Sequence, residues 1–201
     1  TEESSKKQRQ EKQQIQRLRE LKDSVAEASE GDFFLWDLDF PGVMLEGGFD
    51  IVIANPPYVD HQNIIRQDLT QEMQDEMDSS KVQSLKTSYK NDLVEYVRQE
   101  FDIKAYKRSD LYLYFFFKSI DILRGQGTLM FITSNTWLDT SYGKRLQQGL
   151  LELTDLKYII DNRKRRSFEN ADVNTVITAA NETTERYLEE DVQFAAFRKP
   201  Y

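Results

Sequence analysis

Four consecutive residues, Asn55, Pro56, Pro57 and Tyr58, place a carboxamide, two proline rings and an aromatic ring directly after an apolar run. The side-chain oxygen of Asn55 and the carbonyl oxygen of Pro56 can both accept hydrogen bonds from a single NH2 group. Two such acceptors would hold an amine and favour the positive charge that grows on its nitrogen during nucleophilic attack. The ring of Tyr58 could stack on a flat ring system. These four residues are therefore the predicted catalytic residues.

The apolar run before this motif, residues 49–54, predicts a buried strand. Residues 51–53 are β-branched and continuous, as expected for a strand that is covered on both faces in a parallel sheet. The two prolines cannot donate to a ladder and restrict the residues before them to extended geometry, so the strand must stop there. In doubly wound sheets the ligand crevice lies outside the carboxyl ends of the strands, which is where Asn55 is placed.

The motif resembles motif IV of the amino-methyltransferases that use S-adenosylmethionine, and Asn-Pro-Pro-Tyr is similar to the DNA adenine-N6 branch. Other blocks occur in the order seen in the Eco57I-like family of bacterial restriction-modification enzymes and related phage-defence methyltransferases. One of them resembles motif V and another resembles motif VIII. Together with the motif itself, the blocks are residues 34–41, 47–50, 110–115 (motif V), 125–138 and 167–175 (motif VIII).

This resemblance implies an α/β fold, specifically the C-terminal half of a class I (Rossmann-like) methyltransferase sheet with helices, whose final strands are antiparallel. It also implies that the parent protein transfers a methyl group from S-adenosylmethionine to adenine N6 in double-stranded DNA, within a restriction-modification or phage-defence system. Asn55 and the Pro56 carbonyl would orient the amine. Tyr58 would stack on the adenine, and Phe168 would support the base from another side. Asp110 and its helix would border the methionine end of the cofactor.

Two other functions stay open at this point. Asn-Pro-Pro-Tyr also occurs in protein glutamine-N5 methyltransferases, where the same acceptors hold an amide NH2 group. The long insertion after the motif and the block at residues 34–41 favour the DNA branch. The chain could instead be a non-catalytic scaffold or DNA-binding segment, although the intact motif at residues 55–58 argues against this for the parent protein.

The composition excludes several kinds of site. The chain has 201 residues, which is long enough for a real core, and no run approaches the length of a membrane helix or matches a signal peptide. Cysteine is absent, which excludes a disulfide framework and a thiolate metal site. His61 is the only histidine, so a histidine-based metal cluster is excluded and no metal is expected. These features fit a cytoplasmic protein.

The charge pattern points to one basic segment. A net charge of −8 argues against a free-standing nucleic-acid binder. The densest basic cluster, however, lies two residues before Phe168 and is predicted to contact DNA phosphates. A solvated loop between two strands is the equally weighted alternative. The cluster consists of Arg163, Lys164, Arg165 and Arg166.

Hydrophobic periodicity divides the chain into a helical lead-in at residues 1–30 and the catalytic half at residues 31–201. A packing segment at 33–45 is expected to turn at Pro41–Gly42, and residues 59–108 form a predicted helical insertion. Asp110 is expected to cap the helix that follows. The remaining expected elements are helices at 67–78, 81–100, 111–124 and 141–153, and strands at 129–133, 158–161, 173–180 and 193–197.

A complete enzyme of this class also needs a cofactor half with a glycine-rich turn after a strand. Here Gly47–Gly48 precedes a strand, and the glycines at 125 and 127 lead into one. We therefore expect the main S-adenosylmethionine-binding motif to be absent, together with the target-recognition domain. On this interpretation the chain is a fragment, inactive or nearly so alone. Its expected partners are double-stranded DNA and the two missing parts of the parent, with no membrane.

Overall fold

The structure is a computed structural model that describes residues 12, 15, 16, 19, 20, 22, 23, 34–66, 69–162, 174–183 and 191–197. The chain divides into two compact units, Thr1–Phe49 and Asp50–Tyr201, which are described separately below. The predicted sites at Phe168 and at residues 163–166 lie outside the described residues.

The first unit contains two short helices, α2 (Trp36–Asp39) and α3 (Pro41–Leu45), and an aromatic cluster. Neighbouring ring centroids in the cluster are 4.8 to 6.0 Å apart, mostly at steep interplanar angles that suit edge-to-face packing. The expectation of a turn at Pro41–Gly42 is wrong, because Pro41 opens α3. Proline fits the first helical position since its missing N–H has no partner there. The cluster is formed by Phe34, Trp36, Phe40 and Phe49.

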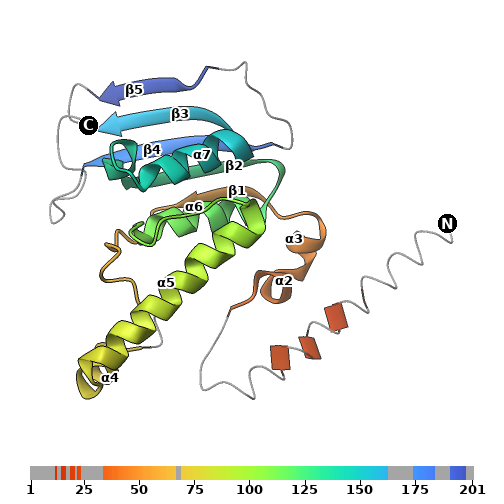
Figure 1. The fold of residues 1–201 in the computed structure, drawn as a ribbon. Coiled ribbons are helices and arrows are strands. Elements are labelled where there is room, and N and C mark those ends of the chain that lie inside the picture. The colour runs from red at the N-terminus through yellow and green to blue at the C-terminus, as the bar shows by residue number, and fades with distance from the viewer. Residues whose placement is uncertain are drawn as a thin grey trace. The chain divides into compact units, whose positions relative to one another are not determined.

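A five-stranded mixed sheet forms the centre of the second unit, in the order β1-β2-β4-β3-β5 (Figure 1). β4 pairs antiparallel with both β2 and β3, so the predicted antiparallel arrangement of the final strands is confirmed. Because β2 and β3 both oppose β4, they run in the same direction and end at the same edge. β5 pairs parallel to β3. The strands are β1 (Phe49–Ala54), β2 (Leu123–Ser134), β3 (Thr154–Asn162), β4 (Thr175–Glu182) and β5 (Gln193–Phe197).

Two helices follow the motif, at residues 71–76 and 79–101. Thr70 and Asp78 cap these helices by accepting hydrogen bonds from backbone N–H groups at distances of 3.3 and 2.8 Å. None of the described helices is both long and apolar enough to cross a membrane. The helices of this unit are α4 (Gln71–Glu76), α5 (Ser79–Phe101), α6 (Leu111–Ile122), the short 3₁₀ helix η1 (Asn135–Leu138) and α7 (Gly143–Leu153).

The core lies between α6, α7 and one face of the sheet (Figure 1). α6 is dense in tyrosine and phenylalanine, and these side chains are mostly buried. The rings of Phe116 and Phe131 are 4.6 Å apart, which joins α6 to β2. The largest fully buried side chains include Trp137, Tyr112, Phe116, Phe117 and Phe131.

The opposite face of β1 is open, contrary to the expectation that both faces of this strand are covered. Val52 and Ala54 pack against the core, whereas Ile51 and Ile53 are 61% and 72% exposed. The β-branched run predicted burial from residue type alone. Within the described part of the second unit, however, α6 and α7 both pack on the core side.

β2 begins earlier than predicted, at Leu123, directly after α6 ends at Ile122. The two glycines of this segment therefore lie inside the strand and do not form a turn that leads into it. Gln126 between them has a positive φ of 67°, and its N–H donates to Glu182 Oε2 at 3.1 Å. Glycine within a strand permits such a local bend.

Gly143 provides a test of this packing, because α7 starts in close contact with η1. A Cβ at this position would lie 1.8 Å from the Trp137 carbonyl oxygen, a backbone atom that cannot move aside easily. We expect Gly143→Ala to lower the free energy of unfolding of the chain by about 1–3 kcal/mol, measured by urea denaturation. Gly125→Ala is the control, since its nearest neighbour would be Glu182 Oε2 at 3.7 Å. Equal stability of the two variants would contradict this account.

Candidate active site

The predicted catalytic motif lies at the end of β1, where its acceptor side chain is accessible. Asn55 is exposed, Pro56 is buried, Pro57 is exposed and Tyr58 is half-buried. The strand ends at Ala54, directly before the residues that the two prolines restrict to extended geometry. The buried Pro56 ring anchors the turn, so the Asn55 carboxamide is left at the surface.

Tyr58 is fixed to the neighbouring strand through its hydroxyl group. Its Oη donates a hydrogen bond to the carbonyl oxygen of Ile132 in β2, at 3.1 Å. Burial raises the pKa of Tyr58 above its ordinary value, so the phenol keeps the proton that it donates. The ring is therefore held through its hydroxyl group, and this hydrogen bond does not involve the faces of the ring.

Asp110 holds the loop that follows the motif. Its Oδ1 accepts a hydrogen bond from the backbone N–H of His61 at 3.3 Å, and its Oδ2 accepts one from Tyr142 Oη at 2.7 Å. The N–H of Leu111 also donates to the Val59 carbonyl at 3.0 Å. The loop is thus tied by two hydrogen bonds, one to the Asp110 carboxylate and one to the backbone of Leu111, the first residue of α6.

The prediction that the Asp110 side chain caps α6 is wrong. Asp110 occupies the N-cap position with extended backbone angles, but its carboxylate makes no capping hydrogen bond. The physical reason is competition, because the oxygens face donors from the loop and from Tyr142 instead. The role as a cofactor-binding residue that the resemblance implied for Asp110 stays a prediction.

Three hydroxyl groups beside Asp110 form a closed cluster. Tyr142 Oη lies 2.9 Å from both Tyr112 Oη and Thr136 Oγ1, and these two atoms are 3.1 Å apart. Ser134 Oγ lies 3.0 Å from Thr136 Oγ1 and accepts the Thr136 N–H. Burial raises the pKa of both tyrosines, so the cluster is neutral beside the Asp110 carboxylate.

Asp60, His61 and Asp110 bring three possible metal-ligand atoms within 4.8 Å of one another. Hydrogen bonding accounts for this grouping. Both Asp110 oxygens accept the bonds described above, and Asp60 Oδ1 accepts the Gln62 N–H at 2.8 Å.

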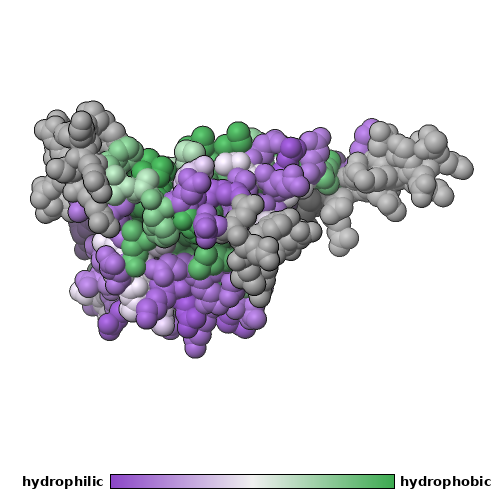
Figure 2. Space-filling model, turned by 90° about the horizontal axis from the view of Figure 1, so that it is seen from above, coloured by the Kyte–Doolittle hydropathy of each residue, from purple (hydrophilic) through white to green (hydrophobic). Residues whose placement is uncertain are grey.

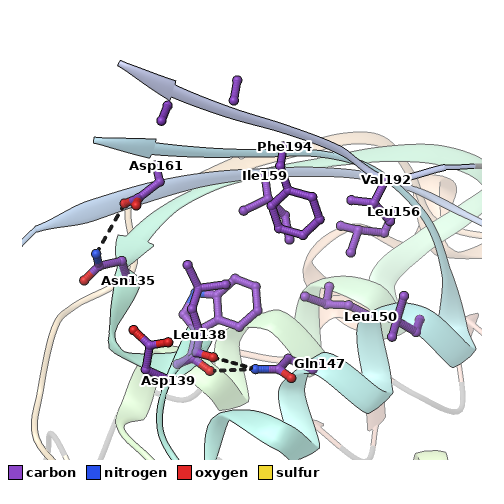
Figure 3. A pocket seen from close by; sticks show the side chains of 14 residues that line it. Asn135, Leu138, Asp139, Gln147, Leu150, Leu156, Ile159, Asp161, Val192 and Phe194 are labelled. Carbon is purple, nitrogen blue, oxygen red and sulfur yellow. Dashed lines mark hydrogen bonds between the residues drawn. The ribbon is translucent and has the colours of Figure 1, made fainter. Parts of the chain in front are cut away.

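A cavity of about 680 Å³ lies between η1, α7, β3 and β5, away from the motif (Figure 3). Its wall is mostly apolar, and at one end Asn135 Nδ2 donates to Asp161 Oδ1 at 3.3 Å. Gln147 donates to the carbonyls of Trp137 and Leu138, which fixes η1 to α7. Viewed from the side of β5, apolar surface gathers in a region bordered by polar surface (Figure 2), and Phe194 of β5 is 73% exposed.

Sequence reasoning missed Tyr142 and Thr136, the two residues that complete the site around Asp110. Thr136 lies in a block that resembles the family, but nothing in the pattern distinguished its hydroxyl. Tyr142 lies outside every such block and immediately precedes a helix. Its role depends on a contact with a residue 32 positions away, which periodicity cannot predict.

The sequence profile of the Eco57I restriction-modification methylase family matches residues 2–168. The chain belongs to this family. It is 31% identical over 141 residues to the type II methyltransferase M.BstVI of Geobacillus stearothermophilus, covering 70% of this chain and 20% of that protein. It is 30% identical over 133 residues to the type II methyltransferase M.PaeR7I of Pseudomonas aeruginosa, covering 66% and 17%.

A further member of this family is similar at lower identity. The type II restriction enzyme and methyltransferase RM.Eco57I of Escherichia coli is 26% identical over 135 residues, covering 66% of this chain and 11% of that protein. The chain thus spans a fifth or less of the curated relatives that it matches. A putative class I S-adenosylmethionine-dependent methyltransferase structure from Listeria monocytogenes aligns with a TM-score of 0.49 and 12% identity, over 76% of this chain and 38% of that one.

Alkaline pH tests the hydroxyl cluster. The pKa values of Tyr112 and Tyr142 are raised in the folded chain, whereas an unfolded tyrosine ionises near pH 10. The stabilisation from the neutral phenols is therefore fully present below about pH 10 and is lost as the pH rises through the folded-state values. We expect the urea midpoint to fall above about pH 10. The double variant Tyr112→Phe/Tyr142→Phe should show a smaller fall, and an equal fall would contradict the assignment.

Proposed function

We propose that the chain is the catalytic and base-binding part of a DNA adenine-N6 methyltransferase of a restriction-modification or phage-defence system. Membership of the restriction-modification methylase family supports the methyl transfer and the DNA substrate. We infer that the methyl acceptor is an amino group from one observation. The Asn55 carboxamide is exposed at the tip of β1 and is followed by the buried Pro56. Because the substrate is DNA, we place the activity in the cytoplasm.

The residues of the motif would act on the adenine amine directly. Asn55 Oδ1 and the Pro56 carbonyl oxygen would accept the two N6 hydrogens, which aims the nitrogen lone pair away from them. As positive charge grows on N6, the two dipoles stabilise it without reorganising. Tyr58 would stack on the extruded base while its hydroxyl stays on Ile132. No residue of the chain forms a covalent intermediate in this scheme.

S-adenosylmethionine, when bound, supplies a methyl group activated by its sulfonium. The described residues offer no glycine-rich turn between a strand and a helix, since Gly125 and Gly127 lie within β2. We infer that the main cofactor anchor belongs to an upstream half of the parent protein, and that Asp110 at most borders that half. The parent would also contribute a target-recognition domain, because the chain covers so little of its relatives.

Phe168 and the basic cluster at residues 163–166 complete the proposal on the DNA side. Phe168 would support the flipped base opposite Tyr58, and the cluster would contact backbone phosphates. These residues follow β3, whose carboxyl end lies at the same sheet edge as that of β2.

Methylation by the full-length gene product that contains this chain tests the function. We expect transfer of labelled methyl groups to adenine N6 in double-stranded DNA and none to a glutamine-containing peptide. Asn55→Ala should lower kcat by about 100- to 1,000-fold, because it removes one of the two acceptors. Asn91→Ala, an exposed asparagine on α5, is the control and should keep full activity. Methylation that is unchanged in Asn55→Ala would remove this residue from the mechanism.

Cofactor binding tests the inferred division of the parent. Calorimetric titration of the 201-residue chain with S-adenosylmethionine should show binding weaker than micromolar, since the main anchor is inferred to lie elsewhere. The full-length gene product provides the positive control under the same conditions. Micromolar affinity of the isolated chain would refute the inferred absence of the anchor.

A further inference from the structure

We propose that Tyr142 is a positioning residue: by holding the Asp110 carboxylate, it fixes the loop at residues 59–61 and thereby the aim of the Asn55 carboxamide. This inference rests on the proposed function. It adds a residue that lies outside the motif and outside the blocks that the sequence analysis singled out. Tyr142 itself would not contact the base or the methyl donor.

The backbone of the loop after the motif makes three hydrogen bonds to the rest of the domain, and one of them is to Asp110. The His61 N–H donates to Asp110 Oδ1, and the Val59 carbonyl accepts from the next residue, Leu111. Lys90 Nζ also donates to the His61 carbonyl, at 3.2 Å. Val59 and His61 are thus held by three hydrogen bonds, and the Asp110 carboxylate accepts one of them.

Tyr142 decides where that carboxylate points. Its Oη donates to Asp110 Oδ2 at 2.7 Å, the shortest hydrogen bond described in this region. A hydrogen bond to a charged acceptor is about twice as strong as one between neutral groups. Without this donor, the Asp110 side chain would be free to turn toward the backbone N–H groups of α6, as an N-cap residue ordinarily does.

Tyr142 is itself immobilised by the packing around it. Its hydroxyl contacts Tyr112 and Thr136, each at 2.9 Å. The next residue is Gly143, and a Cβ at this position would clash with the Trp137 carbonyl oxygen. The start of α7 and η1 are therefore in close contact. The phenol therefore reaches Asp110 from a half-buried position that is packed against the core.

Asn55 needs this support because its own side chain has none. Among the residues that the structure describes, none hydrogen-bonds its carboxamide, which is exposed. Its orientation therefore follows from the backbone on either side. β1 fixes the upstream side, whereas Tyr58 on Ile132 and residues 59–61 on Asp110 fix the downstream side. A displacement of about 1 Å in such an acceptor is enough to slow a reaction about a hundredfold.

The test is Tyr142→Phe in the full-length gene product, with Tyr158→Phe as the matched control. Tyr158 is a tyrosine of β3 at 44% exposure, and the hydrogen bonds described for the Asp110 carboxylate come from His61 and Tyr142 and not from Tyr158. We expect Tyr142→Phe to lower kcat by between about tenfold and a hundredfold. The KM values for DNA and for S-adenosylmethionine should stay unchanged. Tyr158→Phe should have the same kcat and KM values as the unsubstituted full-length product.

A second measurement does not require activity. In the 201-residue chain, hydrogen exchange of the His61 amide should become faster in Tyr142→Phe and stay unchanged in Tyr158→Phe, because only the first variant releases the acceptor of that N–H. Amides in the middle of β4, far from the loop, report any general loss of stability in the same experiment.

The outcomes are distinct. If the unmodified full-length product does not methylate DNA, the proposed function fails, while the exchange experiment still tests the contact. If that product is active and Tyr142→Phe matches it in both kcat and His61 exchange, the inference about Tyr142 is overturned. A raised KM for S-adenosylmethionine with unchanged kcat would also overturn it, since that result assigns Asp110 to cofactor binding. Equal losses in the two variants would show a general structural effect.

Discussion

Pro56 and Pro57 have no amide hydrogen to give to a neighbouring strand, and the position at which they stop β1 determines the rest of the site. The ladder ends at Ala54, and the carboxamide of Asn55 is the first group beyond it. Because Pro56 is buried, the turn that follows β1 stays packed against the domain. A chain without this stop would continue into the sheet and pair the groups that are left available at the strand tip.

The strand tip is connected to the core by hydroxyl and carboxylate groups, while apolar contacts provide the framework. Tyr58 reaches β2, and Asp110 reaches both the loop and Tyr142. The partners of these polar groups come from α6, η1 and the start of α7, whose relative positions are set by buried aromatic rings such as Trp137 and Phe116. Satisfied, partly buried hydrogen bonds of this kind favour one arrangement over others.

Local signals in the sequence predicted the elements well. The runs at 49–54 and 193–197 match β1 and β5 to the residue, because each is a short apolar segment between clear turn signals. The antiparallel pairing of β3 with β4 was also predictable from the resemblance. Predictions failed where a long-range contact overrides a local preference. Asp110 has the residue type of a cap, yet its carboxylate binds partners 32 and 49 positions away. Ile51 and Ile53 have the residue types of a buried strand, but their side chains are exposed.

The spacing of these contacts along the chain determines when the site can form during synthesis. Asn55 is synthesised long before the residues that hold the site. The carbonyl group that accepts from Tyr58 lies 74 residues further along the chain, and Tyr142 lies 32 residues after Asp110. Contacts between distant residues form late in folding, since a long loop must close first. At about 5–20 residues per second, the interval between Asn55 and Tyr142 lasts several seconds. During that time the nascent segment has the chemical groups of the site without its geometry, so on the proposed function base recognition would begin only after Tyr142 has been made.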